Sequence, residues 1–328
     1  MKLSDQSLSV SVVIPLFNKE KEVLRSVNSV LKQTTSNFEV IVVNDGSYDK
    51  GPEIVRAIKD PRIKVINQTN LGVSAARNRG IDEAYADLIA FLDADDEWEP
   101  DFIETVINLK DKFPSCDVFA TNYIFRRKNN YKRNTVIRGL SGDFKEGILN
   151  DYFKIASQSD PPVWSSAVAV TKKALQSVGR FPVGLTSGED LLTWARLAAK
   201  YKIAYSLEPK AYFCEPEILS DNPRIPAIPD IVGEQLKFLL QKNKNSQLDK
   251  GLKEYSALWH RMRANIFIRL KQKREARNEI FKALSYSKST IKLYLFFLLT
   301  MLPASAAKQV FNFLKLFQET KLRQSNRN

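Results

Sequence analysis

The chain has 328 residues and a net charge of +13, and 44% of its residues are hydrophobic. This length and composition are typical of a globular protein with a sizeable core, organised as two domains or as one domain with an appendage. Two cysteines are too few for a disulfide framework or a thiolate metal site. A single histidine, His260, disfavours a histidine-based catalytic triad and an imidazole zinc centre.

The positive charge is concentrated at one end of the chain. Residues 1–231 contain 30 Lys and Arg against 31 Asp and Glu, whereas residues 232–328 contain 20 against 6. This asymmetry predicts a near-neutral body followed by a basic tail. Residues 1–6 lack the apolar core of a signal peptide, so we expect no export. The longest apolar run, 293–302, is too short to cross a bilayer and predicts a buried or interfacial helix.

Strand and helix patterns alternate over the first part of the chain. We expect strands at 8–14, 38–43, 63–66 and 88–92, with intervening helices at 22–33, around 54–58 and at 72–85. This alternation predicts a parallel sheet with helices on both of its faces.

The middle of the chain continues with mixed signals and then changes character. We expect helices at 100–112, 143–155 and 187–198, strands at 117–124, 164–170, 203–205 and 211–213, and a polar hairpin or loop at 126–138. Four prolines between 216 and 229 predict a linker, and helical spacing resumes beyond it as far as Phe317. We therefore expect three parts, namely a domain at 1–215, a linker at 216–231 and a basic helical region at 232–328.

The strand at 88–92 ends in acidic residues. Ligands collect at the carboxyl ends of strands in open α/β sheets. Side chains two apart on a strand point the same way, so Asp93 and Asp95 would present two carboxylates while Ala94 packs inward. This pair suits a hard divalent cation and a bound nucleotide. The alternative is a polar turn in which Asp93 or Asp95 caps the helix that begins at Pro100. We expect Asp96 to face away from the pair and to cap a helix.

Five short segments occur in a set order along the chain: VIPLFN at 13–18, VNDGS at 43–47, NLGVSAARN at 70–78, DADD at 93–96 and GED at 188–190. In this order they resemble the family 2 glycosyltransferases with the GT-A fold, over residues 8–215. The resemblance implies a Rossmann-like, mostly parallel sheet with helices on both faces, followed here by the basic helical region. The acidic segment corresponds to the DXD motif of that fold.

The resemblance implies a site for the nucleotide. Asp45 would accept the imide N–H of a pyrimidine base, a charge-assisted hydrogen bond, while Pro15 and Phe17 line the base pocket. Arg77 would lie near the base and the diphosphate. The alternatives are an Asx-turn formed by Asp45 in the Asn44-Asp45-Gly46-Ser47 sequence and an exposed helix face for Arg77.

The resemblance also implies roles for the remaining acidic residues. Asp93 would contact the ribose or a metal-bound water, and Asp95 would bind Mn²⁺ or Mg²⁺. Asp190 would be the catalytic base and Glu189 would orient the acceptor or the loop. The alternative for these last two is a capping box at 187–190 ahead of an apolar helix. A helix N-terminus lowers the pKa of a carboxylate and a neighbouring charge raises it, so the sequence leaves the direction open.

Two further features bear on the expected site, namely three tryptophans and a missing histidine. Trp98, Trp164 and Trp194 could stack on sugar rings or pack in the core. Other family members often have a histidine beyond the base, and this chain has none there, which puts metal ligation beyond Asp95 in doubt.

The function implied is that of a metal-dependent, inverting hexosyl- or N-acetylhexosaminyltransferase. It would move a sugar from a nucleotide sugar, which we expect to be a UDP-sugar, to a hydroxyl of a glycan or lipid-linked acceptor in surface polysaccharide biosynthesis. One alternative is a sugar nucleotidyltransferase, although the Gly-rich basic loop that would hold its triphosphate is missing after the first strand. Another is a non-enzymatic membrane or scaffold module with a vestigial nucleotide fold.

The basic tail has two interpretations. Its helices could settle on an anionic membrane surface, which would make the protein cytoplasmic and peripheral on the inner membrane. They could equally form a helical bundle whose lysines are simply solvated. Nucleic-acid binding is disfavoured because no recognisable motif accompanies the charge.

Overall fold

The computed structural model describes residues 8–127, 131–215, 225–287 and 291–301. The chain divides into two compact units, residues 1–219 and 220–328. Expectations for residues 1–6, for part of the proline-rich linker and for the helical pattern at Val310, Leu314 and Phe317 lie outside the described residues.

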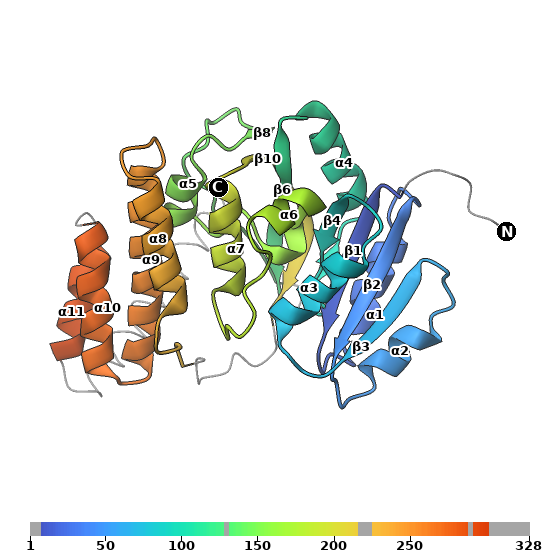
Figure 1. The fold of residues 1–328 in the computed structure, drawn as a ribbon, viewed down its shortest axis with the longest axis horizontal. Helices are drawn as coiled ribbons and strands as arrows, with labels where there is room; N and C mark the ends of the chain where they lie inside the picture. The colour runs from blue at the N-terminus through green and yellow to red at the C-terminus, as the bar shows by residue number, and fades with distance from the viewer. Residues whose placement is uncertain (1–7, 128–130, 216–224, 288–290, 302–328) are drawn as a thin grey trace. The chain divides into compact units, whose positions relative to one another are not determined.

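One mixed sheet organises the first unit (Figure 1). Its central order is β3-β2-β1-β4-β9-β6-β10-β5, with β7 paired to β6 and β8 paired to β10. The strands are β1 (Val10–Leu16), β2 (Phe38–Asp45), β3 (Ile63–Gln68), β4 (Leu88–Phe91), β5 (Glu97–Trp98), β6 (Cys116–Arg126), β7 (Lys132–Asn134), β8 (Glu146–Ile148), β9 (Val168–Thr171) and β10 (Lys202–Cys214).

The first four strands are parallel, as the alternation of strands and helices predicts. β1 pairs in parallel with β2 and β4, and β2 pairs in parallel with β3. Every residue of β1, β2 and β4 is buried, which is typical of strands covered on both faces. β9 is different, because it lies antiparallel to both β4 and β6. Its apolar run gives no information about strand direction, so the sequence did not predict this reversal.

Helices cover both faces of the sheet, as expected. They are α1 (Val23–Leu31), α2 (Gly51–Ala57), α3 (Val73–Glu83), α4 (Phe102–Lys112), α5 (Tyr152–Gln158), α6 (Lys172–Ser177) and α7 (Glu189–Ala198). Val12 of β1 packs in the core that includes α1. Successive strand residues point to opposite faces, and Val13 accordingly meets α3. A Cβ added to Gly80 of α3 would lie 2.2 Å from Val13 Cγ1. The helix α3 therefore packs so close to β1 at this point that only glycine fits.

Four expected elements differ in the structure. The helix expected at 143–155 is instead β8 followed by α5, because residues 146–148 pair with β10. The strand expected at 164–170 begins with a 3₁₀ turn at Ser165–Ala167 and becomes β9 only at Val168. The two short strands expected at 203–205 and 211–213 form one strand, β10. Its register against β6 shifts around Pro209, which has no N–H to donate.

The second unit is helical, with α8 (Ile231–Lys242), α9 (Asp249–Arg269), α10 (Lys273–Tyr286) and α11 (Ile291–Met301). A small core joins α9, α10 and α11 through Ala264, Ile280, Ala283 and Leu293. The helix expected from the apolar run at 293–302 is therefore present as α11. Among the described residues, each helix is too short or too polar to cross a membrane.

Candidate donor and catalytic site

The acidic turn at 93–96 follows β4 at the carboxyl edge of the parallel strands. β1 and β2 end at the same edge, because they run parallel to β4 in the sheet. Ala94 is buried, whereas the side chains of Asp93 and Asp95 are partly exposed. The expected separation of two outward carboxylates from an inward alanine is therefore present.

Asp45 lies at the end of β2, and its carboxylate holds the neighbouring loop. Its Oδ1 accepts hydrogen bonds from Gln68 Nε2 at 2.8 Å and from the Leu71 N–H at 2.9 Å, and its Oδ2 accepts one from the Gly72 N–H at 2.9 Å. Asn44, and not Asp45, makes the turn, because Asn44 Oδ1 accepts the Ser47 N–H at 2.9 Å. The Asx-turn interpretation of Asp45 is therefore wrong.

The two apolar residues expected near the base differ in exposure. Pro15 is buried within β1. Phe17, just beyond the strand, is 40% exposed, and its ring meets Tyr48 edge-on at a centroid distance of 5.8 Å. Of these two residues, only Phe17 has an exposed side chain at the carboxyl edge.

Arg77, on α3, connects the acidic turn to the start of α7. Its Nη2 donates to Asp93 Oδ1 at 2.7 Å, and its Nη1 lies 3.6 Å from Glu189 Oε1. Burial disfavours the charged guanidinium, but the carboxylates of Asp93 and Asp190 outweigh it and raise the pKa of Arg77. The exposed-face interpretation is wrong. Among the described residues, the buried Arg77 Nε and Nη1 have no hydrogen-bond partner, although Nη1 is within ion-pair distance of Glu189.

Glu189 and Asp190 are the first two residues of α7. The residue before them, Gly188, has φ 78° and caps the helix without a side-chain hydrogen bond, so the capping-box interpretation is wrong. Asp190 Oδ1 accepts the Leu191 N–H at 2.7 Å. Burial raises the pKa of both carboxyls, and the charge of Asp190 adds to the rise at Glu189. Arg77 opposes the rise at both residues without cancelling it. Desolvation therefore raises the pKa of both carboxyls, a direction that the sequence left open.

Asp95 is paired with a lysine from the loop after β1. Lys19 Nζ lies 2.6 Å from Asp95 Oδ2, and both side chains are partly exposed. Carboxylate oxygens at an accessible turn are the ligands that Mg²⁺ and Mn²⁺ prefer. Asp93 and Asp95 therefore fit such an ion by chemistry, although a basic side chain neutralises each of them here.

Asp96 faces away from the exposed pair, as expected, because its side chain is buried. It does not cap a helix, so that part of the expectation is wrong. Its side chain is buried, and its oxygens accept hydrogen bonds from Ser166 Oγ at 2.7 Å and from the Cys214 N–H at 3.0 Å. Burial, followed by the charges of Asp95 and Asp93, holds the pKa of Asp96 well above its usual range. This role has no local signature in the sequence, because Ser166 and Cys214 lie far from Asp96 along the chain.

The three tryptophans of this unit belong to the core. Trp98 stacks on Phe102 at a centroid distance of 4.0 Å. Trp164 and Trp194 are also buried and pack against other aromatic rings. The packing interpretation is therefore confirmed.

A second group of potential metal ligands lies in the helical unit. Ligand atoms of Asp230, His260 and Glu279 lie within 4.8 Å of one another. Arg263 Nε, however, lies 3.3 Å from Asp230 Oδ2 and 3.2 Å from Glu279 Oε2. The Arg263 guanidinium thus contacts both carboxylates that a divalent cation would need as ligands, and we interpret the group as a buried ion-pair network. No local pattern indicates that the lone histidine, His260, lies beside the carboxyls of Asp230 and Glu279.

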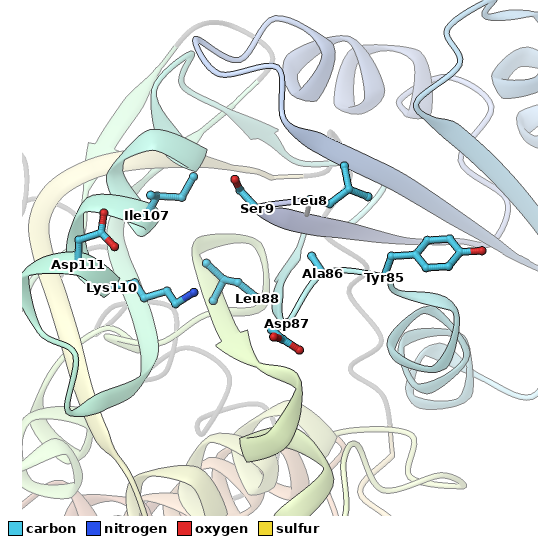
Figure 2. A pocket seen from close by; sticks show the side chains of 9 residues that line it. All are labelled: Leu8, Ser9, Tyr85, Ala86, Asp87, Leu88, Ile107, Lys110 and Asp111. Atoms are coloured by element: carbon cyan, nitrogen blue, oxygen red, sulfur yellow. The ribbon is translucent and has the colours of Figure 1, made fainter. Parts of the chain in front are cut away.

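A pocket of about 310 Å³ lies at the opposite edge of the sheet. Figure 2 shows its lining side chains, which come from the starts of β1 and β4 and from α4: Leu8, Ser9, Tyr85, Ala86, Asp87, Leu88, Ile107, Lys110 and Asp111. These strand starts are remote from the acidic turn, so this pocket is separate from the candidate site.

Comparison with known proteins supports the expected family. Residues 11–168 match the family model described as "Glycosyl transferase family 2". An "Uncharacterized glycosyltransferase" of Rickettsia felis is 32% identical over 195 residues, which are 59% of this chain and 31% of that protein. The "Putative glycosyltransferase EpsH" of Bacillus subtilis is 40% identical over 117 residues, which are 35% of this chain and 33% of that protein. The chain thus spans about a third of the length of these curated relatives.

Solved structures support the fold. The crystal structure of S. aureus TarS 1–349 superposes with a TM-score of 0.63 at 22% identity, covering 85% of this chain and 80% of that one. The same fragment in complex with UDP-GlcNAc gives a TM-score of 0.64 at 20% identity, covering 85% and 81%. The expected α/β fold of the GT-A type, followed by a helical region, is therefore confirmed.

Proposed function

We propose that the chain belongs to glycosyl transferase family 2, whose model matches residues 11–168, and that it transfers a sugar from a nucleoside-diphosphate donor to a hydroxyl acceptor. One observation carries the proposal. The buried Arg77 brings the acidic turn after β4 within reach of the two carboxyls that open α7. A donor-binding half and a base-carrying half thus converge on one guanidinium that still has unused N–H donors.

The donor is a UDP-sugar in this proposal. Support comes from the resemblance and from the likeness in fold to TarS, whose fragment was crystallised with UDP-GlcNAc. Asp45, Pro15 and Phe17 contact the base, Asp93 contacts the ribose, and Arg77 donates to the diphosphate. Asp95 would hold Mn²⁺ or Mg²⁺, and such an ion would supply positive charge near the leaving diphosphate.

The chemical step relies on Asp190. Its carboxylate accepts the proton of the acceptor hydroxyl while the oxygen attacks the anomeric carbon and the bond to the diphosphate breaks. Attack opposite the leaving group inverts the configuration at that carbon. The raised pKa of Asp190 makes it a stronger base than an ordinary aspartate, and Glu189 orients the acceptor.

The acceptor in this proposal is a glycan or lipid-linked glycan in surface polysaccharide biosynthesis. We assign catalysis to residues 1–215, a linker to 216–231 and membrane association to 232–328. The compact units at 1–219 and 220–328 support this division. Large apolar side chains exposed on α10 and α11, at Phe281, Tyr294, Leu298 and Met301, and the positive tail support a peripheral position on the cytoplasmic face of the inner membrane.

The test is nucleotide release by the full chain from UDP-GlcNAc, UDP-glucose, dTDP-glucose and GDP-mannose, with Mn²⁺ and with chelator. Asp190→Asn should lower kcat on the order of 10² to 10⁴-fold and leave the donor KM nearly unchanged. Asp87→Asn is the control, because Asp87 lies at the opposite sheet edge. Equal turnover by Asp190→Asn and the parent would contradict the proposed base. If no donor is turned over, the transferase proposal fails.

A further inference from the structure

A buried hydrogen-bond chain lies beneath the acidic turn. The Asp93 N–H donates to Ser166 Oγ at 3.0 Å, and Ser166 Oγ donates to Asp96 Oδ2 at 2.7 Å. A hydroxyl has one proton and two lone pairs. The Asp93 N–H occupies one lone pair of the Ser166 hydroxyl, and the hydroxyl proton is donated to Asp96. The two residues therefore act as one unit on the Asp93 backbone.

Both members of this unit are fixed by other elements. The second oxygen of Asp96 accepts the Cys214 N–H of β10 at 3.0 Å. The Ser166 carbonyl accepts the indole N–H of Trp98 at 2.7 Å. Ser166 is fully buried and Asp96 is only 3% exposed. Neither side chain can exchange its partners for water without local opening.

The turn is also held by its own backbone and from α1. The Asp96 N–H donates to the Asp93 carbonyl at 3.0 Å. Ser26 Oγ lies 2.8 Å from the Ala94 carbonyl oxygen and 2.6 Å from that of Asp96, so its proton serves both. The side chains of Asp93 and Asp95 remain partly exposed while the backbone beneath them is fixed.

We propose that Asp96 and Ser166 are positioning residues that hold the Asp93 and Asp95 carboxylates in place for the donor and its cation. This proposal rests on the proposed function, since the carboxylates are assigned to donor binding there. Neither residue touches the donor. Positioning partners behind metal ligands typically change metal affinity by about 10 to 100-fold when they are removed.

The chain supplies a matched control at the adjacent position. Ser165 is also buried, but among the described residues its hydroxyl has no hydrogen-bond partner. Ser165→Ala and Ser166→Ala each remove one buried hydroxyl from adjacent positions. Only Ser166→Ala removes the hydrogen bonds to the Asp93 N–H and to Asp96, because the Ser165 hydroxyl does not take part in them. Asp96→Asn should have a smaller effect than Ser166→Ala. The amide keeps one acceptor oxygen where the carboxylate has two, so it can keep one of the two hydrogen bonds that Asp96 accepts.

The first experiment is hydrogen exchange of a peptide covering residues 92–97, which requires no ligand. We expect faster exchange in Ser166→Ala than in Ser165→Ala, with Asp96→Asn between them. Equal exchange in all three variants would overturn the proposal. If Ser166→Ala unfolds globally, exchange will be fast throughout the polypeptide. In that case the test is the comparison of Asp96→Asn with Ser165→Ala, and exchange of the 92–97 peptide should be faster in Asp96→Asn.

The second experiment measures Mn²⁺ affinity by electron paramagnetic resonance and UDP affinity with chelator present. Ser166→Ala should weaken Mn²⁺ binding by about tenfold or more, while metal-free UDP binding through the base pocket stays unchanged. Equal loss in Ser165→Ala would contradict the positioning role. A parent that binds neither Mn²⁺ nor UDP would contradict the proposed function, whereas the exchange experiment would still test the hydrogen-bond chain.

Discussion

Arg77 donates to Asp93 over 2.7 Å although only 4% of the Arg77 side chain is exposed. The guanidinium is therefore a buried positive charge whose counter-charges are the carboxylates of the candidate site. Removing one partner of a buried charge pair leaves the other uncompensated, which costs more than an exposed pair contributes.

We predict that Arg77→Met lowers the free energy of unfolding by about 3–5 kcal/mol. Arg79 is the control on the same helix, because it is half exposed and pairs with Glu83 at 2.7 Å. Arg79→Met should cost less than about 1 kcal/mol. Urea unfolding of both variants measures the difference, and equal losses would show that the buried pair does not stabilise the first unit.

Asp190 should make stability depend on pH. Its folded pKa is raised by burial, so the folded protein disfavours the ionised form. This stabilising contribution is complete below the ordinary aspartate pKa of about 3.9 and is lost as pH rises through the raised folded value. Asp190→Asn cannot ionise. Its stability relative to the parent should increase between about pH 4 and about pH 7.

Urea unfolding of Asp190→Asn and the parent at both pH values provides the measurement. Asp87→Asn again serves as the control, because Asp87 is an exposed residue at the other sheet edge. A difference between Asp190→Asn and the parent that stays constant or shrinks with rising pH would contradict the direction of the pKa shift.

The contact between Gly80 and Val13 predicts a packing defect. An added Cβ would meet both Val13 methyl groups, at 2.2 and 2.8 Å. Gly80→Ala should cost about 1–3 kcal/mol because the helix must move away from β1. For Gly142, no heavy atom lies within 4 Å of the added Cβ, so Gly142→Ala should be nearly neutral. Thermal unfolding compares the two, and a harmless Gly80→Ala would mean that α3 can shift freely on the sheet.

Glu279 should stabilise the helical unit at neutral pH. Burial favours its protonation, but the contact with His260 and the charge of Arg263 outweigh burial and hold the pKa of Glu279 below its usual value. A lowered carboxyl pKa gives stability that is present above the ordinary value of about 4.3 and is lost as pH falls through the folded pKa.

Glu279→Gln should therefore destabilise the protein by about 3–5 kcal/mol near neutral pH and by less near pH 4. Glu275→Gln on the same helix is the control, because Glu275 is only half-buried. Unfolding followed by circular dichroism compares them. Stabilisation of the parent by added Zn²⁺ would contradict the ion-pair interpretation of the cluster around Arg263.

Local pattern was sufficient for much of the fold. The buried parallel strands, the helices between them and the outward orientation of Asp93 and Asp95 follow from short-range periodicity and from the geometry of a strand end. The direction of β9 did not follow, because a run of alternating Val and Ala fits either direction.

The burial and the hydrogen-bond partners of the charged residues could not be predicted from the sequence. Arg77 appears on a polar stretch of helix, yet folding buries it between residues from two other elements. Asp96 looks equivalent to Asp95, but only the tertiary fold brings Ser166 and Cys214 to it. Long-range hydrogen bonds and desolvation decide these roles, and neither has a local signature.

The central claim is that the acidic turn binds a nucleoside diphosphate through a divalent cation. Calorimetric titration of UDP into the full chain tests it most directly, with Mn²⁺ and with chelator, for the parent, Asp95→Asn and Asp87→Asn. We predict that Mn²⁺ strengthens UDP binding about tenfold or more in the parent and in Asp87→Asn, and that Asp95→Asn loses this gain. UDP binding that is equally strong with chelator in all three proteins would contradict the claim.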